Sequence, residues 1–469
     1  MELGNNQYLS TERVSRLMMK FAVPCVISLL VGALYNIVDQ IFIGWGVGML
    51  GNGATNVVFP LTVAALAIAT MIGDGACSHV SISLGRGEQE RANRTVGNAV
   101  VLSLACGLGM MAVYLLFQQP ILWMFGATES NFAYARDYFT FISLGIPFYM
   151  FGQAMNPVIR SDGSPRQAMA FTLVGAGANV ILDPIAIFLL HWGGMGAAVA
   201  TVAGQVLTAL LSFGYLRRMK AVRLSRSSFL LSGGLVWTFL PLGFCSFLSQ
   251  ISLVISMAVT NNMLRLYGGM SVYGEDIPLT VLGIVMKVFQ IIISVSIGLA
   301  AGCIPLVGFN YGAGRLDRVQ ELMWRLLAAE GGLGVAAFVL VEAFPRQLIG
   351  LFGSENELYN QFAVLTFRVY LCMVILACIN KAAFIFLQSL GKPVQSALLS
   401  LFREVILAVP LVVLLPKLWG FGLMGVLYSM PVSDGIAFAA SAAVILRTRR
   451  ELSRLVSKKE KNKILTSLP

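Results

Sequence analysis

Long apolar stretches recur along the whole of this 469-residue chain, and they constrain its fold more than any other feature. Hydrophobic residues make up 57% of the sequence and charged residues only 12%, whereas a soluble protein of this size carries roughly 25% charge. So few charges cannot cover a globule in water, and we therefore expect the chain to be embedded in lipid. A helix that crosses the hydrocarbon core of a bilayer needs about 20 apolar residues.

Charged segments, Gly/Pro segments and Asn/Asp segments divide the apolar sequence into twelve predicted membrane spans. The first six are 17–44, 53–79, 95–118, 133–156, 168–191 and 194–216. The second six are 234–265, 279–306, 323–345, 362–388, 396–416 and 421–447. The predicted fold is thus an all-α integral membrane protein, and an even number of spans places both termini on one side.

The basic residues follow this topology. Of the 33 Lys and Arg residues, 25 fall on the side of the termini, and four fall on the other side: Arg136, Arg265, Arg346 and Lys417. Because Lys and Arg concentrate in cytoplasmic loops, we expect both termini to be cytoplasmic and the protein to lie in the inner or plasma membrane. The net charge of +11 is not gathered on one domain, which argues against nucleic acid as a partner.

Short motifs recur in the two halves of the chain at one separation. The pairs are Gly85-Arg-Gly87 with Gly312-Ala-Gly314, Phe125-Gly126 with Phe352-Gly353, Ser161-Asp-Gly163 with Ser389-Leu-Gly391, and Trp192-Gly193 with Trp419-Gly420, at offsets of 227 or 228. Four pairs in the same order indicate a six-helix unit duplicated in tandem. Six is even, so both copies insert in the same orientation and form two pseudo-symmetric bundles around a central cleft that can open to either side.

This repeat divides the chain into four parts. We predict an N-terminal six-helix lobe at 1–216, a cytoplasmic linker at 217–233, a C-terminal six-helix lobe at 234–447 and a basic cytoplasmic tail at 448–469. The glycine loops at 85–94 and 312–318 are expected to turn the chain tightly at the cytoplasmic face. A phosphate-binding loop is disfavoured there, because no strand precedes it.

Cysteine and histidine usage argues against an enzyme. The seven cysteines lie in apolar runs without CxxC spacing, and we interpret them as small core residues rather than disulfides or metal ligands. His79 and His191 are the only two histidines, whereas an integral-membrane enzyme would call for His and acids clustered near one membrane face. We expect no catalytic residues and no cofactor.

Ionisable residues inside a membrane span are costly, and each is a candidate for function. The candidates are Asp39, Asp74, Asp183, Lys287, Glu330, Lys381, Arg403, Glu404 and Asp434. Asp39 lies about five residues, or roughly 8 Å, below the outer end of the first span. Asp183 lies about eight residues below the end of the fifth span, and Thr201 about seven residues into the sixth. Asn179 precedes Asp183 by one helical turn.

Three helices of one bundle are thus predicted to bring two carboxylates and a hydroxyl to a similar depth. Oxygen ligands of this kind suit Na⁺, and two neighbouring carboxylates equally suit a proton relay. The alternative is that Asn179, Asp183 and Thr201 only join helices by hydrogen bonds. Pro184 cannot donate a backbone hydrogen bond, so we expect it to loosen the helix after Asp183.

The other charges favour a structural network. Asp74 lies near the inner end of its span, where with His79 it is expected to be wetted by the cytoplasm. Arg403 and Glu404 are sequence neighbours, and we expect them to point apart and to need separate partners. Lys287 and Lys381 could pair with Glu404 or Asp434. Asn36, Lys287, Glu404 and Asp434 are retained as secondary polar or cavity residues.

Three segments together resemble the multidrug and toxic compound extrusion (MATE) family, and within it the bacterial MepA-like group. They are Tyr35-Asn-Ile-Val-Asp39-Gln-Ile-Phe-Ile-Gly44, Asn179-Val-Ile-Leu-Asp183-Pro184 and Pro305-Leu-Val-Gly-Phe-Asn310-Tyr-Gly-Ala-Gly314. The resemblance covers all twelve spans. It implies two six-helix lobes around a cleft, and antiport in which entry of H⁺ or Na⁺ drives the efflux of cationic, amphipathic compounds.

The resemblance also implies roles for particular residues. In one branch of the family the coupling ion is held by residues that match Asp39, Asn179, Asp183 and Thr201 here. Another branch uses acids on the seventh and tenth helices, but 234–264 contains no acid and the tenth span offers only Asn380 and Lys381. At the repeat offset Asp183 corresponds to Pro410, so we expect the ion site in the first copy only.

The predicted function is therefore secondary active multidrug efflux by alternating access, with small cationic or amphipathic molecules as substrates, lipid as surroundings and a monomeric protein. The alternative is a flippase of the same superfamily for lipid-linked oligosaccharide or lipid II. Such a protein should line its cavity with several Arg or Lys to hold a pyrophosphate, and few cations lie within these spans. Sequence does not distinguish H⁺ from Na⁺, since both bind the same oxygens.

Overall fold

The computed structural model describes residues 8–274, 276–350 and 357–467, and within these ranges the chain is helical without any strand. The first half contains α1 (Tyr8–Thr11), α2 (Val14–Gly46), α3 (Met49–Arg86), α4 (Gln89–Leu116), α5 (Gln118–Met124), α6 (Phe132–Ser161), α7 (Pro165–Pro184), the π-helical η1 (Ile185–Leu189) and α8 (Gly193–Leu216). The second half contains η2 (Arg226–Phe229), α9 (Gly233–Gly269), α10 (Asp276–Gly312), α11 (Leu316–Ala343), α12 (Pro345–Gly350), α13 (Glu357–Tyr370), α14 (Val374–Ser389), α15 (Pro393–Leu401), the π-helical η3 (Phe402–Leu407), α16 (Ala408–Leu414), η4 (Leu418–Gly420) and α17 (Gly422–Ser467).

Among the described residues ten helices are long and apolar enough to cross a membrane, and α13 with α14, bent by 42°, count as an eleventh span if the bent pair is one span. The fourth predicted span, 133–156, coincides with the 30-residue helix α6, which is not among these candidates. The prediction of an all-α membrane protein is confirmed. The helices overrun their predicted ends, and α17 most of all, since it continues to Ser467.

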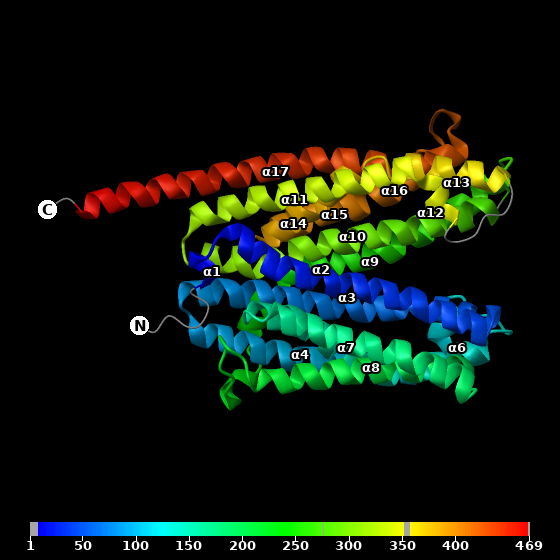
Figure 1. Ribbon diagram of the computed structural model, residues 1–469, viewed down its shortest axis with the longest axis horizontal. Coiled ribbons are helices and arrows are strands. Elements are labelled where there is room, and N and C mark those ends of the chain that lie inside the picture. The colour runs from blue at the N-terminus through cyan, green and yellow to red at the C-terminus, as the bar shows by residue number, and fades with distance from the viewer. Residues whose placement is uncertain (1–7, 275, 351–356, 468–469) are drawn as a thin grey trace.

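The two halves lie side by side as two lobes, with α2 to α8 in one and α9 to α17 in the other (Figure 1). The short helix α1 and the C-terminal part of α17 lie at the same end of the bundle, where α17 extends beyond the other helices. We call this the terminal end. Residues 1–7 and 468–469 of the predicted lobe and tail, and the Phe352-Gly353 motif, lie outside the described residues.

The hydrophobic core is shared between the lobes at the terminal end and divided at the other. One cluster joins Phe21 of α2 and Val80 of α3 to Ile304 of α10, together with residues of α9 and α14. Away from the termini the core separates into a cluster around Phe139 in the N-terminal lobe and one around Phe362 in the C-terminal lobe. The lobes are therefore closed against each other at the terminal end.

Glycines bring the helices of the two lobes into backbone contact at this closure. A Cβ atom added to Gly85 of α3 would lie 2.1 Å from the carbonyl oxygen of Phe309 in α10. A Cβ atom added to Gly312 of α10 would lie 2.2 Å from the carbonyl oxygen of Ile82 in α3. Both members of the second contact are 227 residues from those of the first, so α3 and α10 cross on the pseudo-two-fold axis.

The same symmetry relates the flanking crossings. A Cβ atom on Gly243 of α9 would lie 1.8 Å from the carbonyl oxygen of Met71 in α3. In the other half, a Cβ atom on Gly298 of α10 would lie 2.6 Å from the Cα atom of Val26 in α2. Met71 and Gly298 are again 227 residues apart, while Val26 and Gly243 differ by 217. Only a residue without a side chain allows either approach.

Other glycines of the repeated motifs end helices. Gly87 follows α3 with φ 77°, and Gly314 takes φ 67° in the matching turn after α10. Gly163 and Gly391 adopt φ 84° and 72° in the second pair of motifs. Left-handed backbone of this kind is the usual end of a helix. The predicted tight turns at both glycine loops are confirmed.

The seven cysteines are free, as predicted. Cys25, Cys77, Cys245 and Cys303 are buried at the terminal end, in the core that both lobes share. No cysteine, histidine or acid of the described ranges gathers into a group that could hold a metal ion.

Asp162 anchors the segment between the lobes. Its carboxylate accepts hydrogen bonds from the Tyr215 hydroxyl (2.6 Å) and from the backbone N–H groups of Lys220 (2.7 Å), Ala221 (2.7 Å) and Val222 (3.1 Å). Burial raises the pKa of Asp162, while these four donors act in the opposite direction. The carboxylate thus fixes the start of the 217–232 connection against the first lobe.

Asp162→Asn is expected to destabilise the protein by about 1–3 kcal/mol, because the amide nitrogen cannot accept two of these hydrogen bonds and leaves their donors unpaired. The measurement is the thermal unfolding midpoint in detergent. Asp137→Asn, at a carboxyl whose side chain is 57% exposed, is the matched control and should leave the midpoint unchanged. An equal midpoint for both variants would show that Asp162 does not anchor the connection.

A candidate ion site and cavity in the N-terminal lobe

Two acids from different helices meet inside the N-terminal lobe. Asp39 lies in the last part of α2 and is 8% exposed, and Asp183 lies near the end of α7 and is fully buried. Their carboxyl groups are within hydrogen-bonding reach of each other. The structure therefore brings together the two acids that were selected in the sequence by their similar depth along the helices.

Asn179 connects this pair to the next helix. Its side-chain Nδ2 donates a hydrogen bond to Asp183 Oδ1 (3.3 Å) and another to the Thr201 hydroxyl of α8 (3.2 Å). Asn179 and Asp183 share one face of α7 because they are four residues apart. All four predicted site residues thus form one cluster at the junction of α2, α7 and α8.

The cluster has acceptors in excess of donors. Asp39 Oδ1, Asp183 Oδ2 and Asn179 Oδ1 are buried and lack a hydrogen-bond partner among the described residues. No Lys, Arg or His of the described ranges neutralises the two acids. Two adjacent carboxylates that are both ionised and unpaired in a buried site are very costly, which makes this pair a candidate site for a proton or a cation.

Pro184 changes the helix directly beyond the site. The α-helical pattern of α7 ends at Pro184, and Ile185–Leu189 follows as a π-helix. The missing N–H of proline removes one hydrogen bond of the regular pattern. The predicted loosening after Asp183 is confirmed, and it gives the backbone next to the acid a non-standard, adjustable geometry.

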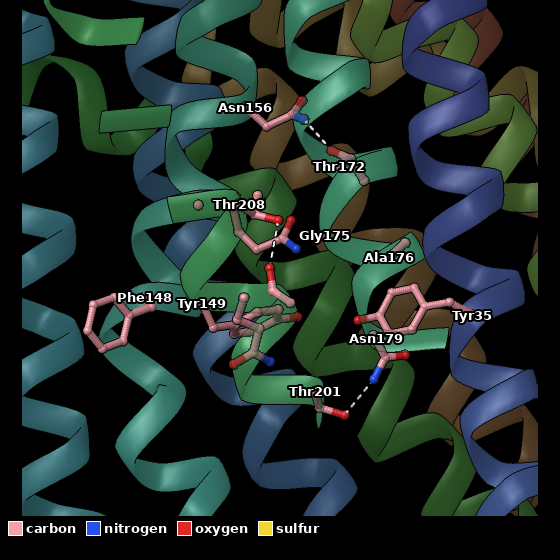
Figure 2. A pocket seen from close by; sticks show the side chains of 14 residues that line it. Tyr35, Phe148, Tyr149, Asn156, Thr172, Gly175, Ala176, Asn179, Thr201 and Thr208 are labelled. Atoms are coloured by element: carbon pink, nitrogen blue, oxygen red, sulfur yellow. Dashed lines mark hydrogen bonds between the residues drawn. The ribbon is translucent and has the colours of Figure 1, made fainter. Parts of the chain in front are cut away.

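A cavity adjoins the cluster within the same lobe (Figure 2). Its volume is about 60 Å³, and Asn179 and Thr201 form part of its wall. Its other polar lining residues are Tyr35, Tyr149, Gln153, Asn156, Thr172, Gln205 and Thr208. Figure 2 shows Asn156 donating to the Thr172 hydroxyl (3.1 Å) on one side and Asn179 donating to Thr201 on the other.

Small residues make room for this cavity. Gly175 and Gly204 lie where α7 crosses α8, and a Cβ atom on Gly204 would stand 2.5 Å from the Gly175 carbonyl oxygen. The cavity is smaller than the roughly 300–1,000 Å³ that is typical of ligand cavities. Asn179 contacts both Asp183 and the cavity, so it links the two acids to the cavity wall.

Sequence reasoning missed most of these cavity residues. Gln153 and Asn156 lie in the fourth predicted span, but only ionisable residues had been sought inside spans. Uncharged amides are also costly in lipid, so their occurrence on one face of a span was the signal that could have revealed the cavity. Tyr35 was noticed only as part of a motif.

The secondary candidates are placed elsewhere. Asn36 is exposed on α2 and donates to the Gly32 carbonyl (2.7 Å) within its own helix. Lys287 is half-buried on α10. Glu404 and Asp434 lie buried in the C-terminal lobe. None of these four lines the cavity of the N-terminal lobe.

Two predictions about charge pairing were wrong in part. Arg403 and Glu404 do not point apart, because Arg403 Nη1 reaches Glu404 Oε1 (3.3 Å) within the π-helical η3. Lys381 pairs with Glu404 as expected, but Asp434 pairs with Arg403 (2.8 Å). Widening of the helix in η3 and the length of the arginine side chain bring the neighbours together.

The prediction for Asp74 also needs correction. Asp74 forms an ion pair with Arg160 of α6 (3.7 Å) and accepts a hydrogen bond from Ser246 of α9 (2.8 Å). Arg160 had been counted as a loop residue, yet it is 4% exposed. His79 bonds to Thr95 (2.9 Å) rather than joining Asp74. Through Ser246, this ion pair links the two lobes.

The fold defines a multi-pass membrane protein made of two related six-helix lobes. The MatE family model matches residues 24–185 and 244–414. The multidrug export protein MepA of Staphylococcus aureus (strain MSSA476) is 23% identical over 450 residues, covering 95% of this chain and 96% of MepA. The chain belongs to the MatE family, the multidrug and toxic compound extrusion (MATE) family that its motifs resemble.

Solved structures share the fold. A crystal structure of a MATE protein in complex with MaD3S has a TM-score of 0.88 at 23% identity, over 97% of this chain and 99% of that one. A multidrug resistance MATE family transporter described in an outward-facing conformation also has a TM-score of 0.88, at 22% identity over 97% and 99% of the two chains.

Proposed function

We propose that this protein is a secondary active antiporter, which exports cationic or amphipathic compounds in exchange for H⁺ or Na⁺. The observation that carries the proposal is the buried pair of Asp39 and Asp183, which lacks a neutralising side chain and lies beside a cavity. The similarity to MepA, a multidrug export protein, supports the substrate class. The polar but uncharged cavity wall suits varied amphipathic molecules.

The proposed orientation follows from the distribution of Lys and Arg, which places both termini in the cytoplasm. The shared core then closes the cytoplasmic half of the protein, and the two separate cores belong to the outer half. Under this proposal the structure represents a state in which the lobes are closed against each other on the cytoplasmic side and separated on the outer side. Alternating access requires such a state.

In the proposed cycle, Asp39 and Asp183 take up H⁺ or Na⁺ from the exterior. Binding removes negative charge beside the cavity, and this charge is what attracts a cationic substrate. The substrate therefore leaves outward as the ion enters. Rearrangement at Asp183 and Pro184 accompanies uptake, because the adjacent π-helix can adjust its hydrogen bonds. The loaded protein then opens to the cytoplasm, releases the ion and binds the next substrate.

The test is transport in proteoliposomes with pH and Na⁺ gradients imposed separately. Ethidium serves as the cationic probe. One of the two gradients should drive ethidium against its concentration difference, and ethidium transport should in turn collapse that gradient. If neither gradient drives ethidium, and ethidium dissipates neither gradient, the antiport proposal is wrong.

The flippase alternative predicts a different cavity. A pyrophosphate-bearing lipid calls for basic side chains, whereas the described residues that line this cavity include no Lys or Arg. A fluorescent polyprenyl pyrophosphate in the same vesicles distinguishes the two activities, because a flippase would translocate it whereas an exporter of cationic compounds would not.

A further inference from the structure

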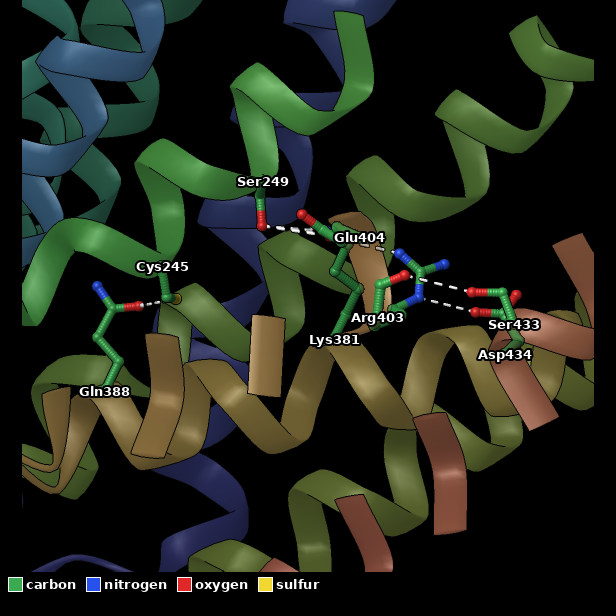
Figure 3. A network of polar contacts seen from close by, with 8 residues as sticks. All are labelled: Cys245, Ser249, Lys381, Gln388, Arg403, Glu404, Ser433 and Asp434. Carbon is green, nitrogen blue, oxygen red and sulfur yellow. Dashed lines mark hydrogen bonds and ion pairs between the residues drawn. The ribbon is translucent and has the colours of Figure 1, made fainter. Parts of the chain in front are cut away.

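Four charged side chains form a buried chain of contacts in the C-terminal lobe (Figure 3). Lys381 of α14 pairs with Glu404 of η3, Glu404 contacts Arg403, and Arg403 pairs with Asp434 of α17. Their exposed fractions are 6%, 6%, 8% and 2% for Lys381, Glu404, Arg403 and Asp434. With two cations and two anions, the group is neutral when all four are ionised.

By the tandem repeat, this group of charges corresponds in position to residues that line the cavity of the first lobe. At the 228-residue offset of the second motif pair, Lys381 corresponds to Gln153 and Glu404 to Ala176. Gln153 and Ala176 both line the cavity of the N-terminal lobe. The ion pair of Lys381 and Glu404 therefore lies where the second lobe would have its counterpart of that cavity.

The two cations of the group are held differently. Arg403 is fixed by Asp434 through Nε (2.8 Å), and its backbone carbonyl accepts a hydrogen bond from Ser433 (3.2 Å). The Lys381 ammonium ends a flexible stem and contacts the Glu404 carboxylate, the Ser249 hydroxyl (3.3 Å) and the face of Phe384 (5.0 Å to the ring centre).

A carboxylate, a hydroxyl and an aromatic face are the groups that bind an organic ammonium ion. Glu404 Oε2 is also buried and has no hydrogen-bond partner in the described part of the chain, so the carboxylate has a further acceptor to offer a cation. Without Lys381 the group would carry one uncompensated negative charge. A foreign cation could then restore neutrality.

We propose that Glu404, Ser249 and Phe384 form a binding site for a primary ammonium group, and that the side chain of Lys381 occupies this site as a tethered ligand. The site is separate from the acids of the N-terminal lobe, and its existence does not depend on the proposed antiport. A purely structural ion pair would join α14 to η3 but would not accept a free amine.

The experiment replaces the tethered ligand with a free one. Lys381→Ala removes three methylene groups and the ammonium, which together correspond to propylammonium. Purified Lys381→Ala protein in detergent should unfold at a lower temperature than the unmodified protein, because Glu404 loses its main cation. Propylammonium chloride should then raise the midpoint saturably, by about 2 °C or more relative to equal NaCl.

Two controls distinguish a site from a general salt effect. Lys392→Ala removes a lysine that pairs with Glu451 near the surface, and it should give no saturable response to propylammonium. Lys381→Met combined with Glu404→Gln removes both charges at similar volume and should fold without responding to the amine.

The proposal is overturned if propylammonium shifts Lys381→Ala no more than Lys392→Ala. It is equally overturned if Lys381→Ala fails to fold both with and without the amine while the double variant folds, because an empty but intact site should be rescued. Recovery of folded Lys381→Ala only in the presence of propylammonium would support it.

Discussion

Asp183→Asn is expected to reduce gradient-driven efflux of ethidium to background while the protein remains folded. Asparagine has the shape of aspartate and can still accept the hydrogen bond that Asn179 donates. It cannot bind a proton or contribute negative charge to a Na⁺ site, so the acids would no longer respond to the gradient. Asp39→Asn should have the same effect, because the two neighbouring carboxyl groups form one site in the proposed cycle.

The measurement is efflux from proteoliposomes, with the amount of folded protein determined by size-exclusion chromatography. Asp137→Asn is the matched control, since it removes an exposed carboxyl from the same lobe and should leave efflux unchanged. Full gradient-driven efflux in either Asp39→Asn or Asp183→Asn would rule out these acids as the coupling site.

Gly243→Leu is expected to prevent closure of the lobes at the terminal end and thereby to stop transport. The first atom of the new side chain would already stand 1.8 Å from the Met71 carbonyl oxygen, which belongs to backbone and cannot turn away. Overpacking of this kind costs about 1–3 kcal/mol or more, and about 1.4 kcal/mol within this range already shifts the equilibrium tenfold towards the open arrangement.

The buried cysteines report on this closure. Cys77 and Cys245 lie in the core shared by the lobes and should react slowly with N-ethylmaleimide in the unmodified protein. In Gly243→Leu they should react about tenfold faster or more, because the shared core is opened. Gly331→Leu adds the same side chain to a helix at a position with no atom within 4 Å, and it should label like the unmodified protein. Equal labelling of both variants would contradict the proposed closure.

Sequence was sufficient to place the acids because the outer ends of the helices that carry them are marked by glycines, at 44–53 and at 193–194. Asp39 and Asp183 could be compared in depth without knowing how α2 and α7 pack, and the structure places them in contact. Whether they couple transport to an ion is a separate question that the two substitutions address. The tandem repeat was equally visible, since its motifs consist of glycines that end helices at matching points.

The structural features that could not be predicted from the sequence depend on contacts between distant segments. The break between α13 and α14 contains no glycine or proline in residues 371–373, so no local signal marks it. The burial of Arg160 depends on Asp74, a residue 86 positions away. The contact of Arg403 with Glu404 depends on a π-helical turn that a regular helical projection cannot show. Tertiary packing determines each of these three features.

The glycine crossings restrict how the two copies of this duplicated chain can evolve. Gly85 and Gly312 each meet a backbone atom of the opposite lobe, and every amino acid has the same backbone atoms. A larger residue at either glycine therefore cannot be compensated by changing the side chain at Ile82 or Phe309. A second substitution that compensates for such a change would have to move the two helices apart as whole units. The crossing of Gly175 and Gly204 places the same restriction on the interior of the N-terminal lobe.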